Sequence, residues 1–316
     1  MAERLHDPWL VAVWPGMGTV AMGAGYYLMA KLGMHLWEEL PARDLFEVDH
    51  VDVKDGLIQV APLPRSRLFL WKDPQQHHDL IVFIGEAQPP AKSGLICHQL
   101  IDLVRPLGVT RVFTFAAMAT GMRPGDAGRV FGAAIDRGTL ARFKDLDLTV
   151  LEGGQINGLN GVLLGVAAES GMQGGCLLGE MPQLFAQLPY PKASLAVLEF
   201  FITLAGIKVD LSELESHAQD VEQKLEVFLS RIEQAIHQVE GSTESAVPVT
   251  EPEEEESEKK KPKLNAEDRQ HLEKLFTEAK KDRSRAYFLK QELDRLKVFR
   301  EYEDRFLDLF KTPGGG

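Results

Sequence analysis

The sequence contains little that would predict a disulfide framework, a zinc site or a membrane span. Its 316 residues include only two cysteines, Cys97 and Cys176, which lie far apart and belong to no Cys-x-x-Cys pair. No apolar run approaches the roughly 20 residues that a membrane-spanning helix needs. The first residues, MAERLHDP, lack the apolar core of a signal peptide. We therefore expect a cytoplasmic protein without a membrane partner.

Positive charge and familiar catalytic motifs are also scarce. The chain has 35 Lys and Arg against 47 Asp and Glu, a net charge of −12, so binding of nucleic acid through a basic surface is not expected. G-x-S-x-G, a Walker loop and H-E-x-x-H are missing. Cys97 and His98 are neighbours in a helical pattern, where their side chains diverge by about 100° and cannot form a thiolate–imidazole couple. His77 and His78 have no spaced partner that would complete a metal site, and we expect no metal and no cofactor.

What the sequence does contain is an alternation of buried strands and helices. Its 44% hydrophobic content is enough for one α/β core with an appendage. Short apolar runs bounded by turn residues alternate with segments of helical periodicity, which predicts a mostly parallel sheet covered on both faces. The predicted strands span 9–14, 67–71, 79–85, 111–117, 147–152 and 174–179. The predicted helices span 18–33, 93–108, 158–169 and 192–205.

Beyond this domain, residues 1–210, the pattern changes. Nine apolar residues spaced three and four apart predict a heptad helix over 211–239, whose seam packs either on its own domain or on another helix or chain. Pro, Ser, an acidic block and a Lys block predict a disordered charged linker at 240–263. An amphipathic helical segment at 264–311 and a flexible tail at 312–316 follow.

The amphipathic segment has two possible roles. It either folds back on the heptad helix as a brace or stays free to capture another protein. Folding back would place three apolar residues from each segment in contact: Leu225, Phe228 and Ile232 with Leu289, Leu293 and Leu296.

A glycine-rich turn follows the first predicted strand. Gly16 and Gly18 begin a match to the G-x-G-x-x-G/A template of a dinucleotide-binding turn. Such a site also needs an acidic residue at a strand end about 20 positions later. Glu38 and Glu39 lie near that distance, but we expect them near a helix terminus. We therefore favour a purely structural turn, and further glycines suit close packing of the following helix: Gly23 and Gly25.

Several short motifs follow the turn in order. They are Gly-Glu-x-Gln-Pro after strand 79–85, Thr-Gly at 120–121, Ile-x-Gly-Leu-x-Gly at 156–161, Leu-Leu-Gly-Glu-x-Pro at 177–182 and Pro-x-Ala-Ser-x-x-x-Leu-Glu at 191–199. Together they resemble the proteasome assembly chaperone 2 family over residues 8–215. The resemblance implies a three-layer α/β sandwich similar to the phosphorylase/hydrolase-like fold, assembled as a homo-oligomer, for which we expect a trimer. It does not cover residues 240–316.

Three carboxylates form a candidate site. Glu86, Glu152 and Glu180 each follow a predicted strand, and the carboxyl ends of parallel strands converge on one edge of a sheet. Within about 10 Å of one another, they would suit metal binding or acid–base chemistry. The favoured alternative is that they cap helices or form hydrogen bonds across a subunit interface. Neighbouring residues that would complete either arrangement are Thr120, Gly121, Asn157 and Asn160.

Two classes of function are therefore open. The leading hypothesis is a non-enzymatic assembly chaperone or scaffold, and the family resemblance implies proteasome subunits as partners. The alternative is a hydrolase or ligase acting on a small carboxylate or nucleoside in a carboxylate-lined crevice. Archaeal members of the family dock on proteasome rings through a hydrophobic–Tyr–any tail. The sequence ends in Pro-Gly-Gly-Gly at 313–316 instead, so docking of that kind is not expected.

Overall fold

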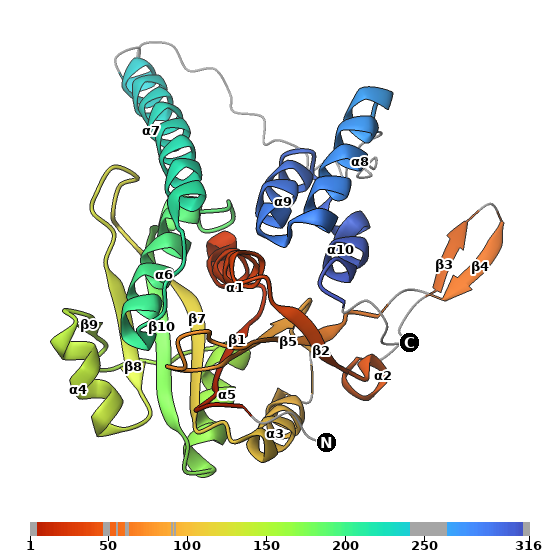
Figure 1. The fold of residues 1–316 in the computed structure, drawn as a ribbon. Helices are drawn as coiled ribbons and strands as arrows, with labels where there is room; N and C mark the ends of the chain where they lie inside the picture. The colour runs from red at the N-terminus through yellow and green to blue at the C-terminus, as the bar shows by residue number, and fades with distance from the viewer. Residues whose placement is uncertain are drawn as a thin grey trace.

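A mixed β-sheet forms the centre of the molecule (Figure 1). The computed structural model describes residues 5–46, 51–54, 56–60, 63–89, 91, 93–240 and 264–311. Most of the predicted linker, 241–263, and the predicted tail lie outside these ranges. Within them, eight strands pair in the order β2-β5-β6-β1-β7-β10-β8-β9. Their bounds are β1 Trp9–Val13, β2 His35–Leu40, β5 Ser66–Trp71, β6 Leu80–Gly85, β7 Arg111–Thr120, β8 Val130–Ala134, β9 Thr149–Val150 and β10 Gln173–Pro182.

The central strands run parallel, as predicted. β6, β1, β7 and β10 pair in parallel register. On one side, β5 is antiparallel to β6 and β2 is antiparallel to β5. On the other side, β8 is antiparallel to β10, and β9 is parallel to β8. The edges of the sheet therefore reverse direction, which the strand predictions did not anticipate.

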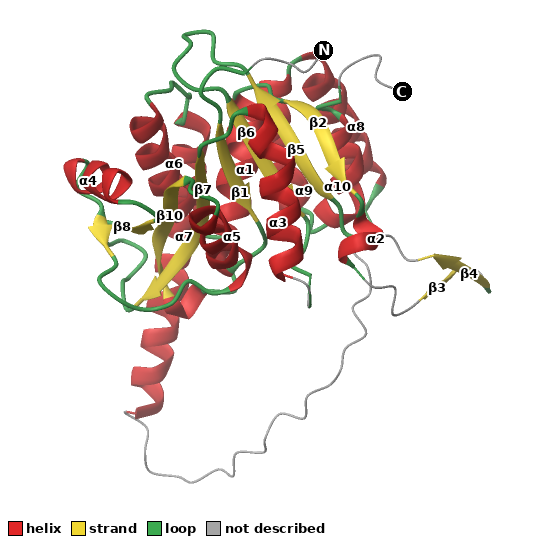
Figure 2. Ribbon diagram, turned by 90° about the horizontal axis from the view of Figure 1, so that it is seen from below, coloured by secondary structure: helices red, strands yellow, loops and turns green. Residues whose placement is uncertain are grey.

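Helices cover both faces of this sheet (Figure 2). Alternate residues of β1 face opposite ways: Trp9, Val11 and Val13 join one core cluster, whereas Leu10 and Ala12 join the other. The first cluster lies under α1 and α6, and the second under α3 and α5. The helix bounds are α1 Val20–Lys31, α2 Ala42–Leu45, α3 Ser93–Val104, α4 Arg137–Asp145, α5 Gly158–Glu169 and α6 Pro191–Ala205.

Two glycines let α1 approach its neighbours closely. A Cβ added to Gly25 would lie 2.6 Å from a methyl carbon of Val13, and one added to Gly23 would lie 2.9 Å from Ser194 Oγ. The first contact joins α1 to β1 and the second joins α1 to α6. Larger side chains would push the helix off the sheet, so these glycines serve packing.

The heptad seam meets two different environments. In α7 (Ser212–Glu240), Leu214 and Ala218 are buried on the α/β body and Leu225 is 8% exposed. One turn further, Phe228 is 51% exposed. The helix thus begins as part of the core and then projects beyond it (Figures 1 and 2).

The carboxyl-terminal segment folds back over α1 and the β2–β5 side of the sheet. It forms α8 (Ala266–Lys281), a short 3-10 turn, α9 (Ala286–Arg295) and α10 (Phe299–Asp308). The rings of Tyr27 and Tyr287 lie 4.5 Å apart, and those of Tyr26 and Phe306 lie 5.8 Å apart. Leu36 N donates a hydrogen bond of 2.7 Å to Phe310 O.

The predicted contact between Leu225, Phe228 and Ile232 and the three leucines of 264–311 is therefore wrong. Leu289 and Leu293 are fully buried, but α9 packs on α1 and α8. α9 meets α7 near the start of that helix, where His217 Nδ1 lies 3.2 Å from Tyr287 Oη. The segment instead covers the aromatic side chains of α1, Tyr26 and Tyr27, which are 1% and 0% exposed beneath it.

A separate hairpin projects from the end of the sheet (Figure 1). β3 (Val51–Lys54) and β4 (Leu57–Val60) form a two-stranded antiparallel pair after α2. The pattern-based prediction left this stretch without regular structure.

Candidate functional site

The glycine-rich turn is occupied by the protein's own hydrogen bonds. Gly18 has φ +59°, a conformation that favours glycine, and an added Cβ would lie 2.6 Å from Met181 Sδ. Its N–H donates to Ala186 O and its carbonyl accepts from Tyr190 N, each at 2.8 Å. The turn therefore ties the start of α1 to the loop after β10. Gly16, by contrast, is extended at φ −163° with no described atom within 4 Å of an added Cβ, so neither its backbone conformation nor a close contact requires glycine at this position.

The acidic pair expected near a helix terminus lies in a strand instead. Glu38 and Glu39 belong to β2, which is three places from β1 in the sheet. At about 4.8 Å per strand, that is about 14 Å from the turn's strand. Glu39 Oε2 accepts a hydrogen bond of 3.1 Å from Arg67 Nε. The acid of a dinucleotide site is thus not beside the turn.

Glu180 lies inside β10 and is bound on all sides. Its carboxylate is 4% exposed and accepts hydrogen bonds from Arg129 Nε at 2.9 Å, Arg129 Nη2 at 2.7 Å and Thr120 Oγ1 at 2.9 Å. Arg129 N also donates to it at 3.1 Å. These bonds, led by those from the guanidinium, lower the pKa of Glu180 to about 2. Of the predicted site residues, Thr120 and Glu180 are therefore in contact. Gly121 begins the exposed loop that ends at Arg129.

Glu86 holds a different arginine. Arg67, from β5, is 1% exposed, and its Nη1 donates to Glu86 Oε1 at 2.7 Å. The other guanidinium nitrogens reach Glu39 Oε2 at 3.1 Å and Asp304 Oδ1 at 2.6 Å. Arg65 N donates to the second oxygen of Glu86 at 2.8 Å. This group of residues, the Arg67 cluster, joins the strand ends of β5 and β6 to α10.

Burial dominates the electrostatics of the Arg67 cluster. Burial is the largest of the effects that together raise the pKa of Glu86 to about 7. The charges of Glu303 and Asp304 act in the same direction, whereas the Arg65 amide and Arg67 oppose them. Burial also raises the pKa of Glu303, whose Oε1 accepts a hydrogen bond of 2.6 Å from Tyr26 Oη.

The three carboxylates do not form one site. Glu86 follows β6, and Glu180 lies near the end of β10. Because β1 and β7 separate these two strands, about 14 Å of sheet lies between the carboxylates. Glu152 is exposed and follows β9, which runs antiparallel to β10 and so points to the opposite edge. The carboxylate-lined crevice of the enzyme hypothesis is therefore not formed. Among the described residues, no group of three or more His, Cys, Asp and Glu is arranged to hold a metal.

The two predicted asparagines, Asn157 and Asn160, lie at the start of α5. Asn157 occupies the N-cap position, but its side chain makes no capping hydrogen bond within the described chain. Asn160 is 9% exposed in α5, and its Oδ1 has no partner among the described residues. Thr114 Oγ1 donates to its main-chain oxygen at 3.4 Å. Gln88 Oε1 instead accepts from Leu159 N at 3.2 Å, which holds the first turn.

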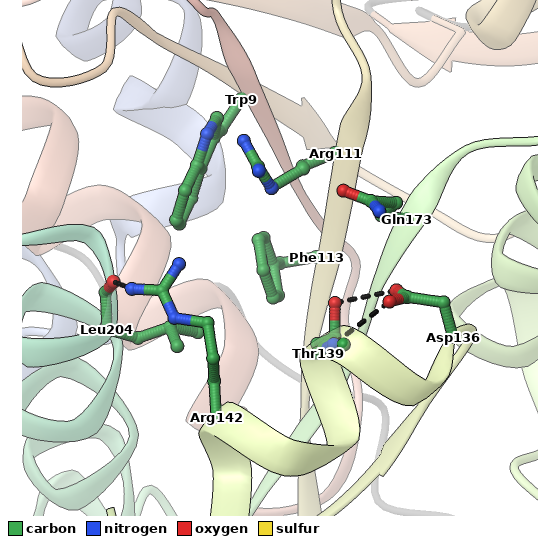
Figure 3. A pocket seen from close by; sticks show the side chains of 9 residues that line it. Trp9, Arg111, Phe113, Asp136, Thr139, Arg142, Gln173 and Leu204 are labelled. Atoms are coloured by element: carbon green, nitrogen blue, oxygen red, sulfur yellow. Dashed lines mark hydrogen bonds between the residues drawn. The ribbon is translucent and has the colours of Figure 1, made fainter. Parts of the chain in front are cut away.

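A small cavity that the sequence did not predict lies at the amino-terminal edge of the central strands (Figure 3). Its volume is about 170 Å³, and Trp9, Phe113 and Arg111 line it from β1 and β7. Arg111 is already paired with Asp7 at 3.1 Å, and Arg142 Nη2 donates to Leu204 O at 2.7 Å. Asp136 and Thr139, also in the lining, bond to each other.

A larger groove of about 450 Å³ separates α7 from α9. Charged side chains of both signs line it, and Phe288 of α9 is 49% exposed there. Such a mixture of charge and an exposed aromatic ring suits recognition of a protein surface more than binding of a small molecule. The charged residues are Glu213, Asp220, Lys224, Glu292 and Arg295.

The cysteines are not poised for chemistry. Cys97 and Cys176 are buried, and burial raises the pKa of each thiol to about 12. Within the described ranges, every helix is too short or too polar to cross a bilayer.

Comparison with known proteins identifies the family. The model of the PAC2 family matches residues 10–229. The chain belongs to the PAC2 family. An uncharacterized protein of Methanocaldococcus jannaschii is 27% identical over 227 residues, which are 71% of this chain and 84% of that protein.

Solved structures agree with the PAC2 assignment of the fold. The archaeal proteasome activator PbaB of Pyrococcus furiosus superposes with a TM-score of 0.61 at 24% identity, covering 74% of this chain and 96% of PbaB. A proteasome-assembly chaperone homologue of Mycobacterium tuberculosis gives a TM-score of 0.59 at 20% identity, covering 68% and 93%. The PAC2 match includes the sheet and half of α7, and α8 to α10 lie beyond it.

Proposed function

We propose that this chain is a non-enzymatic assembly chaperone or scaffold for proteasome subunits, acting in the cytoplasm as a homo-oligomer, most simply a trimer. The observation that carries the proposal is membership of the PAC2 family, together with the roles named for its structural relatives, an archaeal proteasome activator and a proteasome-assembly chaperone homologue. In this proposal, residues 1–210 form a three-layer sandwich of the phosphorylase/hydrolase-like class, and 264–311 brace it.

The geometry of the strand ends supports binding over catalysis. A catalytic carboxylate needs a free oxygen that faces a substrate. Both oxygens of Glu180 accept bonds from Arg129, and both oxygens of Glu86 accept bonds from Arg65 or Arg67. These groups hold loops and strands in place.

The groove between α7 and α9 is our candidate for the partner-binding surface. α7 projects beyond the body, and the brace holds α9 opposite its first turns, so the two helices present one surface. Phe288 supplies an exposed aromatic anchor, and the surrounding charges form a polar rim.

Direct binding to purified proteasome subunits tests the proposal. The full chain is immobilised and titrated with the proteasome α subunits, the β subunits and the assembled core particle of the same organism. We expect saturable binding to at least one of them and faster assembly of the core particle from its subunits. Absence of both effects would refute the proposed function.

A pair of variants locates the surface. Phe288→Asp places a charge in the groove, whereas Val162→Asp places one on α5, on the opposite face of the sheet, at a residue that is also partly exposed at 37%. Phe288→Asp should weaken subunit binding about tenfold or more, as loss of an aromatic anchor does, and Val162→Asp should leave it unchanged. Equal effects of both variants would exclude the groove.

A further inference from the structure

The β3–β4 hairpin has one apolar face and one polar face. Residues directly opposite each other in an antiparallel pair share a face. Val51 lies opposite Val60, and Val53 lies opposite Ile58, so four β-branched side chains make one face. Asp52 lies opposite Gln59 on the other face, which also carries the apolar Leu57, 68% exposed.

This apolar face is open to water. The four side chains are between 50% and 75% exposed, with Val51 the least and Val60 the most. A two-stranded hairpin is at best marginally stable in water unless another layer covers its apolar face. The described part of this chain supplies no such layer, which indicates that another surface covers the hairpin.

A second exposed apolar surface lies at the base of the projecting half of α7. Phe228 is 51% exposed, and its ring lies 6.3 Å from that of Phe185, in the 3-10 turn after β10. Leu184 and Leu188, on either side of Phe185, are 65% and 45% exposed. We call Leu184, Leu188 and Phe228 the α7 patch.

The two surfaces lie at opposite ends of the molecule. The hairpin follows β2, the end strand of the sheet, whereas the α7 patch follows β10, five places away. Both views show the hairpin and α7 on opposite sides of the body (Figures 1 and 2). The hairpin of one chain therefore does not reach the α7 patch of the same chain.

We propose that the apolar face of the β3–β4 hairpin docks on the α7 patch of a second copy of this chain, so that copies join head to tail in a closed ring. The inference rests on the self-association named in the proposed function and assigns the surfaces that produce it. A contact between two different patches is heterologous, and heterologous contacts form rings when the rotation closes.

Area favours this arrangement over pairing of two hairpins. Each surface consists of three or four exposed apolar side chains, far fewer than the roughly 20–30 residues that one partner contributes to a standard interface. In a ring every copy uses both surfaces and is held by two contacts. Pairing of hairpins would use one contact for each copy and leave the α7 patch in water.

Charge substitutions on each surface of the full chain test the proposal. Val53→Lys with Ile58→Lys disrupts the apolar face, and Gln59→Lys adds the same charge to the polar face as a matched control. Leu184→Lys with Phe228→Lys disrupts the α7 patch. Sedimentation velocity should give several times the monomer mass for the unchanged chain and for Gln59→Lys. Both double variants should sediment as monomers and keep the circular-dichroism spectrum of the folded unchanged chain, because all these residues are exposed.

Mixing the two double variants distinguishes head-to-tail contacts from symmetric ones. At about 100 µM, which suits a weak single contact, the mixture should form a dimer of the two different chains, because one intact hairpin meets one intact patch. A mixture that stays monomeric, a hairpin variant that keeps the full mass, or a patch variant that still dimerises would overturn the proposal. An unchanged chain that is itself monomeric would refute the underlying self-association as well, so the first measurement separates the two failures.

Discussion

Replacing Arg67 with methionine removes the charge that joins the sheet to the carboxyl-terminal helices. The guanidinium is 1% exposed and bonds to Glu86, Glu39 and Asp304. Methionine keeps much of the side-chain volume, so the change isolates the loss of charge and hydrogen bonds from the loss of packing.

The expected loss of stability comes mainly from one of the three pairs. Glu39 and Asp304 have side chains that are 38% and 58% exposed, so water screens their pairing with Arg67. Glu86 is only 14% exposed and is left as a buried charge without its cation. Removing one partner of a buried pair costs about 3 kcal/mol, which corresponds to a fall in melting temperature of about 5–10 °C for a chain of this size.

The loss of stability caused by Arg67→Met should depend on pH. The folded-state pKa of Glu86, about 7, lies above the ordinary value of 4.5, so folding favours its protonated form, and stability is lost as pH rises through 7. Without Arg67 the pKa rises further. The destabilisation by Arg67→Met should therefore be large at pH 8 and clearly smaller at pH 6, where Glu86 takes up a proton.

Urea unfolding at the two pH values provides the assay. Asp304→Asn is the matched control and should cost less than about 1 kcal/mol, because that carboxylate is exposed. Adding Glu86→Gln to Arg67→Met should recover part of the lost stability, since the uncompensated charge is gone. A loss below about 1 kcal/mol, or one equal at pH 6 and pH 8, would refute the reasoning.

Four other predictions follow from the fold. Deleting residues 264–311 should lower the melting temperature of the remaining chain, because the segment buries aromatic rings against α1; an unchanged temperature would show that the segment is not a brace. Gly18→Val should cost about 1–3 kcal/mol through its positive φ and the contact with Met181, whereas Gly16→Val should cost within about 0.5 kcal/mol in a urea titration. The low pKa of Glu180 contributes stability above pH 4.5 that is lost as pH falls toward 2, so Glu180→Gln should flatten the acid limb of a pH–stability curve. Calorimetry with NAD, NADP and ATP should show no binding tighter than about 1 mM, because the amide of the glycine-rich turn is already bonded; micromolar binding would contradict the structural turn.

Strongly patterned elements were predictable from the sequence. The predicted helix 158–169 coincides with α5, and the predicted strand 9–14 contains β1. In both, a dense apolar pattern ends at glycine or proline, so burial and turn chemistry agree on the boundaries. β10 runs further than the predicted 174–179, to Pro182, and this places Glu180 inside a strand.

Weakly patterned elements were missed. β2 reads His-Leu-Trp-Glu-Glu-Leu, which is too polar for a buried strand, because it is an edge strand partly open to water. β8 and α4 are short and contain small or charged residues. The β3–β4 hairpin did carry a signal, an Asp-Gly pair at 55–56 between alternating apolar residues, which is typical of a two-residue hairpin turn.

The sequence by itself determined which segments are buried, because apolar periodicity acts within a few residues of the chain. It determined the alternation of strands and helices, and with them the layers. Only the tertiary structure decided which charges meet. Arg67 bonds to Asp304 across 237 positions, and Glu86 is separated from Glu180 because β1 and β7 lie between their strands. Strand order and the docking of α10 depend on the summed burial of distant surfaces, and no local pattern records that sum.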